Sequence, residues 1–156
     1  MRGWLVVAIV GAARVAAADA TCPTASGTAM LAVEERSDAP PGEQPAPPTS
    51  TLELYDNGAI ASLTARGREQ IRKTGCLDAA TLKKIRAALA AARWRTVRCT
   101  GCATCKRYST EYSVIRWKGR VVFTQRVCSK DGLDEASQRA LDDALEAIAR
   151  VRLTAR

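Results

Sequence analysis

The sequence contains no histidine, and this absence removes several classes of chemistry. Its 156 residues include 24 Lys and Arg, 16 Asp and Glu, and no His. Ser-His-Asp and Cys-His catalysis need an imidazole as the general base, and haem attachment through Cys-x-x-Cys-His needs it as a ligand. Histidine ligation of a metal is excluded in the same way. We therefore expect a protein that is not an enzyme and that uses no cofactor.

Aromatic residues are also scarce, at 4% of the chain. They are not interleaved with the basic residues, as base stacking on a nucleic-acid-binding surface requires. We therefore expect no nucleic-acid partner, although the formal net charge is +8. Long apolar runs are missing as well. The apolar run at residues 4–13 has ten residues, whereas a membrane-spanning helix needs about 20.

The first 20 residues have the pattern of a secretory signal peptide. Arg2 supplies a positive charge before the apolar run, and Ala18 and Ala20 are small residues at the two positions that a signal peptidase reads. We predict cleavage after Ala20, which removes residues 1–20. The mature protein would be secreted or periplasmic, with no membrane span.

Six cysteines follow that cleavage site, and they are Cys22, Cys76, Cys99, Cys102, Cys105 and Cys128. An even number in an exported chain favours a disulfide framework, for which six cysteines allow 15 connectivities. We predict two or three bridges. Cys128 should lie near Cys105 or Cys102, the chain after the first helix should bring Cys99 back toward Cys76, and Cys22 should join whichever thiol remains.

Two other uses of the cysteine cluster stay open. Cys99–Cys102 and Cys102–Cys105 each have the Cys-x-x-Cys spacing of a redox-active pair, although the residues that follow favour a strand and such pairs usually begin a helix. Four thiolates also suit zinc or an iron–sulfur cluster. An oxidising compartment favours disulfides over both, so we predict no metal site.

Proline divides the mature chain into two parts. Five of the six prolines lie in residues 40–48, which cannot join a helix or a sheet ladder and should form a surface loop. We predict an N-terminal segment over residues 21–50, with a weak strand signal at residues 28–34. A single domain over residues 51–156 follows.

Two hairpins are predicted in that domain. Asn57-Gly58 favours a two-residue turn within residues 51–63, and pairing outward from it puts Leu52, Leu54, Ala61 and Leu63 on one face and Glu53, Tyr55, Ile60 and Ser62 on the other. A turn at Lys118-Gly119 predicts the second hairpin, over residues 108–127. Its expected pairs are Val114 with Phe123, Tyr112 with Gln125, Arg116 with Val121, Ile115 with Val122, and Glu111 with Arg126.

Two amphipathic helices are predicted, each opened by a Leu-Asp pair in which the aspartate is the N-cap. The first follows Asp78 and ends near residue 93, and the second follows Asp134. Their inward side chains should be Leu82, Ile85, Leu89 and Ala92 in the first, and Leu141, Ala144, Leu145, Ile148 and Val151 in the second. Residues 65–75 are polar and are expected to be a connection.

The predicted fold class is therefore α+β, in the order ββα-ββα and stabilised by disulfides. An antiparallel sheet of four to five strands, built from the two hairpins, would carry both helices on one face. This order of elements over residues 51–151 is similar to the layout of emfourin-type proteinase inhibitors. The similarity lies in the element order and assigns no site residue.

The sequence predicts an exported binding or inhibitory module that is not catalytic. A disulfide-held loop over residues 96–107 would present Arg98, Lys106 and Arg107 to an acidic protein or an anionic envelope polymer. The alternative functions are a thiol–disulfide redox protein that uses the cysteine cluster, and a metal site with four cysteine ligands.

Overall fold

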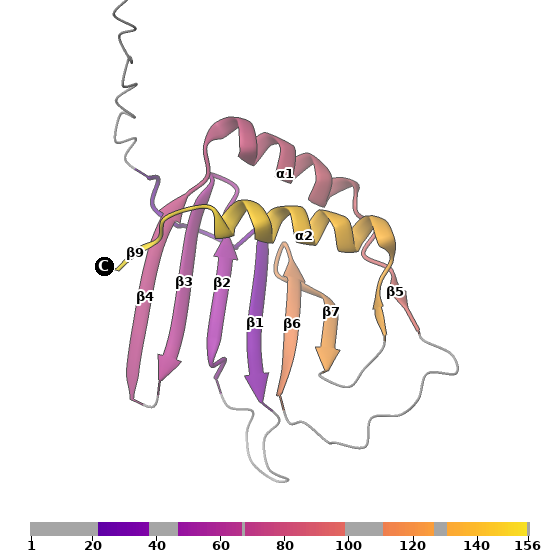
Figure 1. The fold of residues 1–156 in the computed structure, drawn as a ribbon, viewed down its shortest axis with the longest axis horizontal. Coiled ribbons are helices and arrows are strands. Elements are labelled where there is room, and N and C mark those ends of the chain that lie inside the picture. The colour runs from indigo at the N-terminus through magenta and orange to yellow at the C-terminus, as the bar shows by residue number, and fades with distance from the viewer. Residues whose placement is uncertain (1–21, 38–46, 67, 99–110, 127–130, 156) are drawn as a thin grey trace, which may run out of the picture.

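The computed structural model describes residues 22–37, 47–66, 68–98, 111–126 and 131–155. An antiparallel sheet of seven strands runs through it in the spatial order β7-β6-β1-β2-β3-β4-β9 (Figure 1). Its strands are β1 (Leu31–Ser37), β2 (Ser50–Leu54), β3 (Ala59–Arg66), β4 (Glu69–Cys76), β6 (Glu111–Trp117), β7 (Arg120–Arg126) and β9 (Thr154–Ala155).

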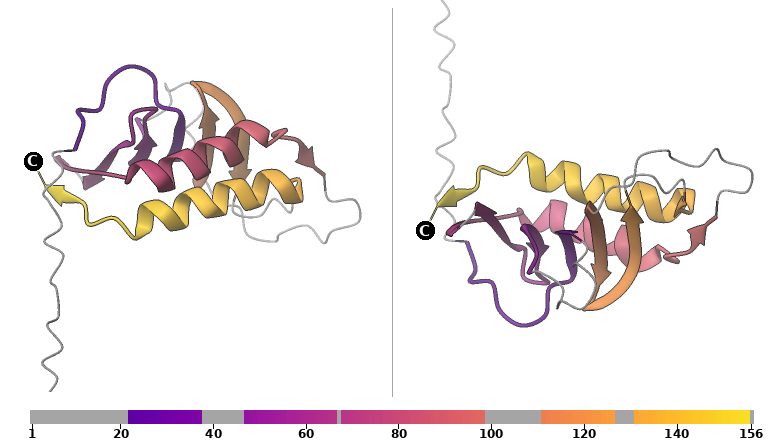
Figure 2. Two further views of the ribbon diagram at one scale, coloured as in Figure 1. Left: turned by 90° about the horizontal axis from the view of Figure 1, so that it is seen from above. Right: turned by 90° about the horizontal axis from the view of Figure 1, so that it is seen from below.

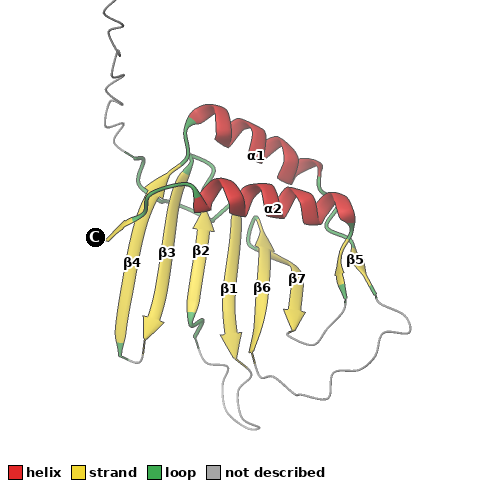
Figure 3. Cartoon of the chain, viewed as in Figure 1, coloured by secondary structure: helices red, strands yellow, loops and turns green. Residues whose placement is uncertain are grey.

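Both helices, α1 (Ala79–Ala91) and α2 (Glu135–Ala149), lie side by side on one face of that sheet (Figure 2, Figure 3). A separate two-stranded ladder pairs β5 (Thr96–Val97) with β8 (Gly132–Leu133). The prediction of an α+β fold with two helices on one face is confirmed. The predicted sheet of four to five strands is wrong, because the sheet has seven.

The sheet is larger than predicted because a polar segment within residues 65–75 forms strand β4. Half of its eight residues are exposed, and its side chains show no apolar pattern of period two. Pairing with β3 along its whole length holds it in the sheet. The weak strand signal near residue 30 corresponds to β1, which lies between β6 and β2.

The core lies between the sheet and the helices, and the predicted helix faces are confirmed. Ile85 and Leu89 of α1 are buried, as are Leu141, Ala144 and Ile148 of α2, while the other predicted inward residues are partly buried against them. The sheet contributes Leu31, Leu54, Ile60, Ile115 and Phe123.

Both predicted N-caps are also confirmed. The carboxylate of Asp78 accepts hydrogen bonds from the backbone N–H groups of Ala80 and Thr81, at 3.0 and 2.9 Å. That of Asp134 accepts one from Ser137 at 2.8 Å. These bonds satisfy N–H groups that the first helical turn leaves without an intrahelical partner, so each helix begins where its sequence predicts.

The first hairpin differs from its predicted register by one residue. Its connection is not the predicted two-residue turn: the backbone N–H of Tyr55 donates to Ala59 O at 2.9 Å, which closes a three-residue loop. Gly58 takes a φ of +85° in that loop, the left-handed conformation that such a loop requires. As a result, Leu54 pairs with Ile60.

A slip of one residue moves side chains to the opposite face of a strand. Ile60 lies in the main core with Leu52 and Leu54, whereas Ala61 packs with Tyr55 on the other face. The predicted faces of β3 are therefore wrong, and the error arises from the loop length alone.

The second hairpin keeps its predicted turn but contains a bulge. Arg116 pairs with Val121 as predicted, and a register shift then follows between Ile115 and Arg116. Beyond it Ile115 pairs with Phe123, so the pairs predicted for Val114, Tyr112 and Ile115 are each wrong by one residue. Arg126 pairs with Tyr112 and not, as predicted, with Glu111. A bulge adds one residue to one strand, and no turn signal in the sequence reveals it.

Candidate functional site

The face of the sheet opposite the helices carries charged side chains of the central strands β1 and β6. We call it the open face. Side chains alternate along a strand, so Leu31 and Val33 of β1 join the core while Glu34 and Arg36 lie among the open-face residues. The register places Arg116 and Tyr112 of β6 on this face too.

Glu34 is the centre of a charged cluster on the open face. Its Oε1 accepts a hydrogen bond from Arg116 Nε at 2.7 Å, and its Oε2 accepts one from Arg36 Nε at 2.7 Å. Burial alone would raise the pKa of Glu34, but the two arginines outweigh it and hold this pKa below its usual value. The carboxylate is therefore charged at neutral pH and neutralises one of its two partners.

Arg126 continues this cluster across the sheet. Arg36 pairs with Tyr112 across β1 and β6, and Tyr112 pairs with Arg126 across β6 and β7. The guanidinium carbon of Arg126 lies 4.9 Å from the ring centroid of Tyr112, a cation–π contact. The three open-face arginines, Arg36, Arg116 and Arg126, therefore lie on three adjacent strands around Glu34 and Tyr112.

A hollow of about 410 Å³ opens on the same face over β2, β3 and β4. It is lined by Thr51, Glu53, Ala61, Ser62, Leu63, Gln70 and Arg72. The hydroxyl of Tyr55 donates to Glu53 Oε2 at 2.8 Å beside it. Burial and this hydrogen bond raise the pKa of Tyr55 to about 12, so the phenol stays protonated and keeps Glu53 in place.

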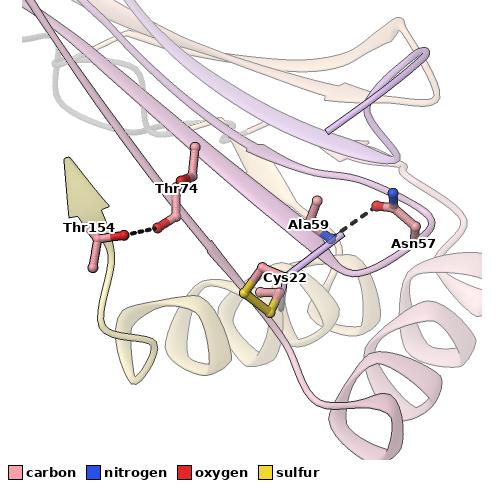
Figure 4. Close-up of a disulfide and its surroundings, with 6 residues drawn as sticks. Cys22, Asn57, Ala59, Thr74 and Thr154 are labelled. Carbon is pink, nitrogen blue, oxygen red and sulfur yellow. Dashed lines mark hydrogen bonds between the residues drawn. A yellow bond between two sulfur atoms is a disulfide. The ribbon is translucent and has the colours of Figure 1, made fainter. Parts of the chain in front are cut away.

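Residues 22–30 cross one end of the open face, and we call them the strap. A disulfide joins Cys22 to Cys76 at the end of β4, with Cα atoms 5.4 Å apart (Figure 4). Asn57 Nδ2 donates to Thr24 O at 2.9 Å, while Asn57 Oδ1 accepts from the backbone N–H of Ala59 (Figure 4). The strap is thus held covalently at one end and by a turn side chain next to it.

The strap covers a small second core. Ala25 and Ala29 pack against three buried residues of the open face, Tyr55, Ala59 and Ala61. At its far end, Met30 N–H donates to Leu54 O, and Met30 O accepts from Lys118 N–H. The expected pairing of Cys76 with Cys99 is wrong, because Cys76 is bonded to Cys22.

Of the site residues predicted from the sequence, the structure places Cys22, Cys76 and Arg98. Arg98 is exposed directly after β5. Cys99, Cys102, Cys105, Lys106, Arg107 and Cys128 lie outside the described residues, so the remaining disulfides and the redox and metal alternatives stay predictions. Within the described ranges no three His, Cys, Asp or Glu residues are grouped as metal ligands.

The ladder of β5 and β8 fixes the start of the predicted loop. Thr96 pairs with Leu133, and Val97 pairs with Gly132. The backbone N–H of Asp134, the N-cap of α2, also donates to Arg95 O at 2.8 Å. Arg98 therefore directly follows a strand that is hydrogen-bonded to the residues at the start of α2.

Sequence reasoning missed the open-face arginines. They are separated by up to 90 residues along the chain, and only the pairing of β1 with β6 and of β6 with β7 brings them together. The alternation of Glu34 and Arg36 at spacing two was the one local signal. It gives no information on which strand lies beside β1.

Comparisons of the chain with protein-family models, with curated proteins and with solved structures gave no match. Among the described residues, neither helix has the length and apolar character needed to span a membrane.

Acid should weaken the Glu34 cluster. Because the pKa of Glu34 is lowered in the folded protein, its ion pairs stabilise the fold fully above the unfolded pKa, and this contribution is lost as the pH falls through the folded pKa. We expect Glu34→Gln to be less stable than the wild type at pH 7 and the difference to shrink below pH 4.5. Urea denaturation at several pH values measures this, and a difference that stays constant down to about pH 2 would contradict it.

Proposed function

We propose that this protein is an exported, disulfide-stabilised domain that acts by binding an acidic partner and not by catalysis. The observation that carries the proposal is the β5–β8 ladder, which fixes the two residues directly before Arg98, where the segment that also bears Lys106 and Arg107 begins. Ordering a binding segment before its partner arrives lowers the entropy cost of association. A basic segment whose start is fixed in this way suits recognition of acidic groups.

The Cys22–Cys76 disulfide supports the export part of the proposal. Structural disulfides persist in oxidising compartments and are rare in the cytosol. This bond lies directly after the predicted signal peptide cleavage site, and it closes the strap across the sheet. Its formation would follow translocation of the chain.

The charge of the chain supports the acidic partner. Removal of residues 1–20, which contain Arg2, Arg14 and Asp19, changes the formal net charge from +8 to +7. This charge attracts anionic surfaces over distances set by the Debye length, about 8 Å at physiological salt. Such attraction raises association rates and is not specific by itself. Specificity would come from Arg98, which directly follows the ladder, and from Lys106 and Arg107 farther along the same segment.

Charge reversal tests the proposal. The mature protein would be titrated at about pH 7 and 0.15 M salt against two labelled probes, poly-L-glutamate for an acidic protein and polygalacturonate for an anionic envelope polymer. We expect the triple variant R98E/K106E/R107E to bind about tenfold or more weakly. The matched control is K83E/K84E/R93E, which changes three exposed cations next to or within α1.

The two variants alter net charge equally, so they separate a site from general attraction. Equal loss in both would show that net charge alone drives binding. No binding of the wild type to either probe would overturn the proposed function outright.

A further inference from the structure

We infer that the open-face arginines and the outer edge of β7 form a docking surface for an extended acidic polypeptide segment. The inference rests on the proposed function, because it names a surface and a partner class for the same binding activity. The surface comprises Arg36, Arg116, Arg126, Tyr112 and strand β7. It lies on described residues and is independent of the predicted loop.

The Glu34 carboxylate occupies only some of the N–H donors of Arg36 and Arg116. A guanidinium has five N–H donors. Arg36 gives Nε and Nη2 to Glu34, while Arg116 gives Nε to Glu34 and Nη1 to Gly119 O at 3.5 Å. Their side chains are 23% and 31% exposed. Further donors can therefore reach an incoming carboxylate, and one negative charge on Glu34 cannot balance the two arginines.

Strand β7 gives this surface a sheet edge. Of the described strands, β7 pairs with β6 alone, so it ends the seven-stranded order. Most of its residues are exposed, and Val121 is 52% exposed. An extended chain that pairs with such an edge gains main-chain hydrogen bonds, and its alternate side chains then contact one face of the sheet. On the open face those side chains would lie next to Arg126.

These two features together favour a polypeptide over a polysaccharide. Both polymers can carry carboxylates that match the planar guanidinium fork. Only a polypeptide also presents backbone N–H and C=O groups at the repeat of a β-ladder. The chemistry that fits is thus a segment of alternating acidic residues in extended conformation.

The test uses the complete mature protein and measures the fluorescence anisotropy of a labelled oligo-L-glutamate peptide at about pH 7 and 0.15 M salt. We expect Arg126→Glu to weaken binding about tenfold. Glu34→Gln should tighten it severalfold, because it removes the carboxylate that competes for Arg36 and Arg116. Lys84→Glu, an equal charge change on the exposed side of α1, should stay within about twofold of the wild type.

The Glu34→Gln variant separates a binding effect from a folding defect, since a misfolded variant is not expected to bind the peptide more tightly. If Arg126→Glu behaves as Lys84→Glu while the loop variant R98E/K106E/R107E loses binding, this inference is overturned and the proposed function stands. If the loop variant binds normally and Arg126→Glu does not, the docking surface on the open face is supported and the role of Arg98, Lys106 and Arg107 in binding is overturned. Polygalacturonate that binds as tightly, with the same sensitivity to Arg126→Glu, would overturn the choice of a polypeptide.

Discussion

Replacing both Cys22 and Cys76 by serine is expected to lower the free energy of unfolding by about 3–4 kcal/mol. The bond closes a sequence separation of 54 residues, and the chain-entropy relation for a loop of this size gives about 4 kcal/mol. The double change also avoids leaving one reactive thiol that could pair wrongly. Urea denaturation followed by tryptophan fluorescence measures the loss.

The strap should loosen in the same variant. Tyr55, Ala59 and Ala61 are covered in the described structure by strap residues Ala25 and Ala29. We therefore expect faster amide hydrogen exchange at strap residues, with the α1–α2 layer unaffected at low denaturant. Equal stability of the variant and the wild type would show that the strap is not held by this bond.

Leu54→Ala should cost about 3 kcal/mol, within the range of about 2–5 kcal/mol found for removing a buried leucine side chain. Leu54 is 0% exposed and lies in the main core. The matched control is Leu63→Ala, which is expected to cost about 1 kcal/mol or less because Leu63 is only half-buried beside the open hollow.

This pair of variants tests the register of the first hairpin. A two-residue turn would put Leu54 and Leu63 on the same buried face, so the two substitutions would cost similar amounts. The three-residue loop that Tyr55 and Ala59 close puts them on opposite faces. Losses of similar size in thermal denaturation would contradict the structure.

The helices could be predicted from the sequence because their signals are local. Asp78 and Asp134 are caps, and apolar side chains recur at helical spacing after each. The ion pairs Glu135–Arg139 and Glu146–Arg150 on α2 also depend on local spacing. Four-residue spacing suffices to bring such partners together on a helix.

The sheet could be predicted only in part, because pairing is not local. The polar sequence of β4 gives no strand pattern, since β4 lies near the sheet edge and half of its residues are exposed. A single bulge and a single extra loop residue shift whole faces. The open-face arginines follow from that pairing and so could not be found in advance.

The disulfide could not be chosen from the sequence for a similar reason. Six cysteines allow 15 pairings, and spacing along the chain favoured Cys99 as the neighbour of Cys76. The strap instead brings Cys22 across the ends of the strands to Cys76. Its course depends on contacts with Asn57 and Tyr55, which lie far away in sequence.

Mass spectrometry of the non-reduced protein, purified after expression with its N-terminus intact, tests the central claim most directly. The account predicts a chain that begins at Thr21 and a proteolytic peptide pair joined through Cys22 and Cys76. A chain that keeps residues 1–20, or a bond from Cys76 to Cys99, would contradict it.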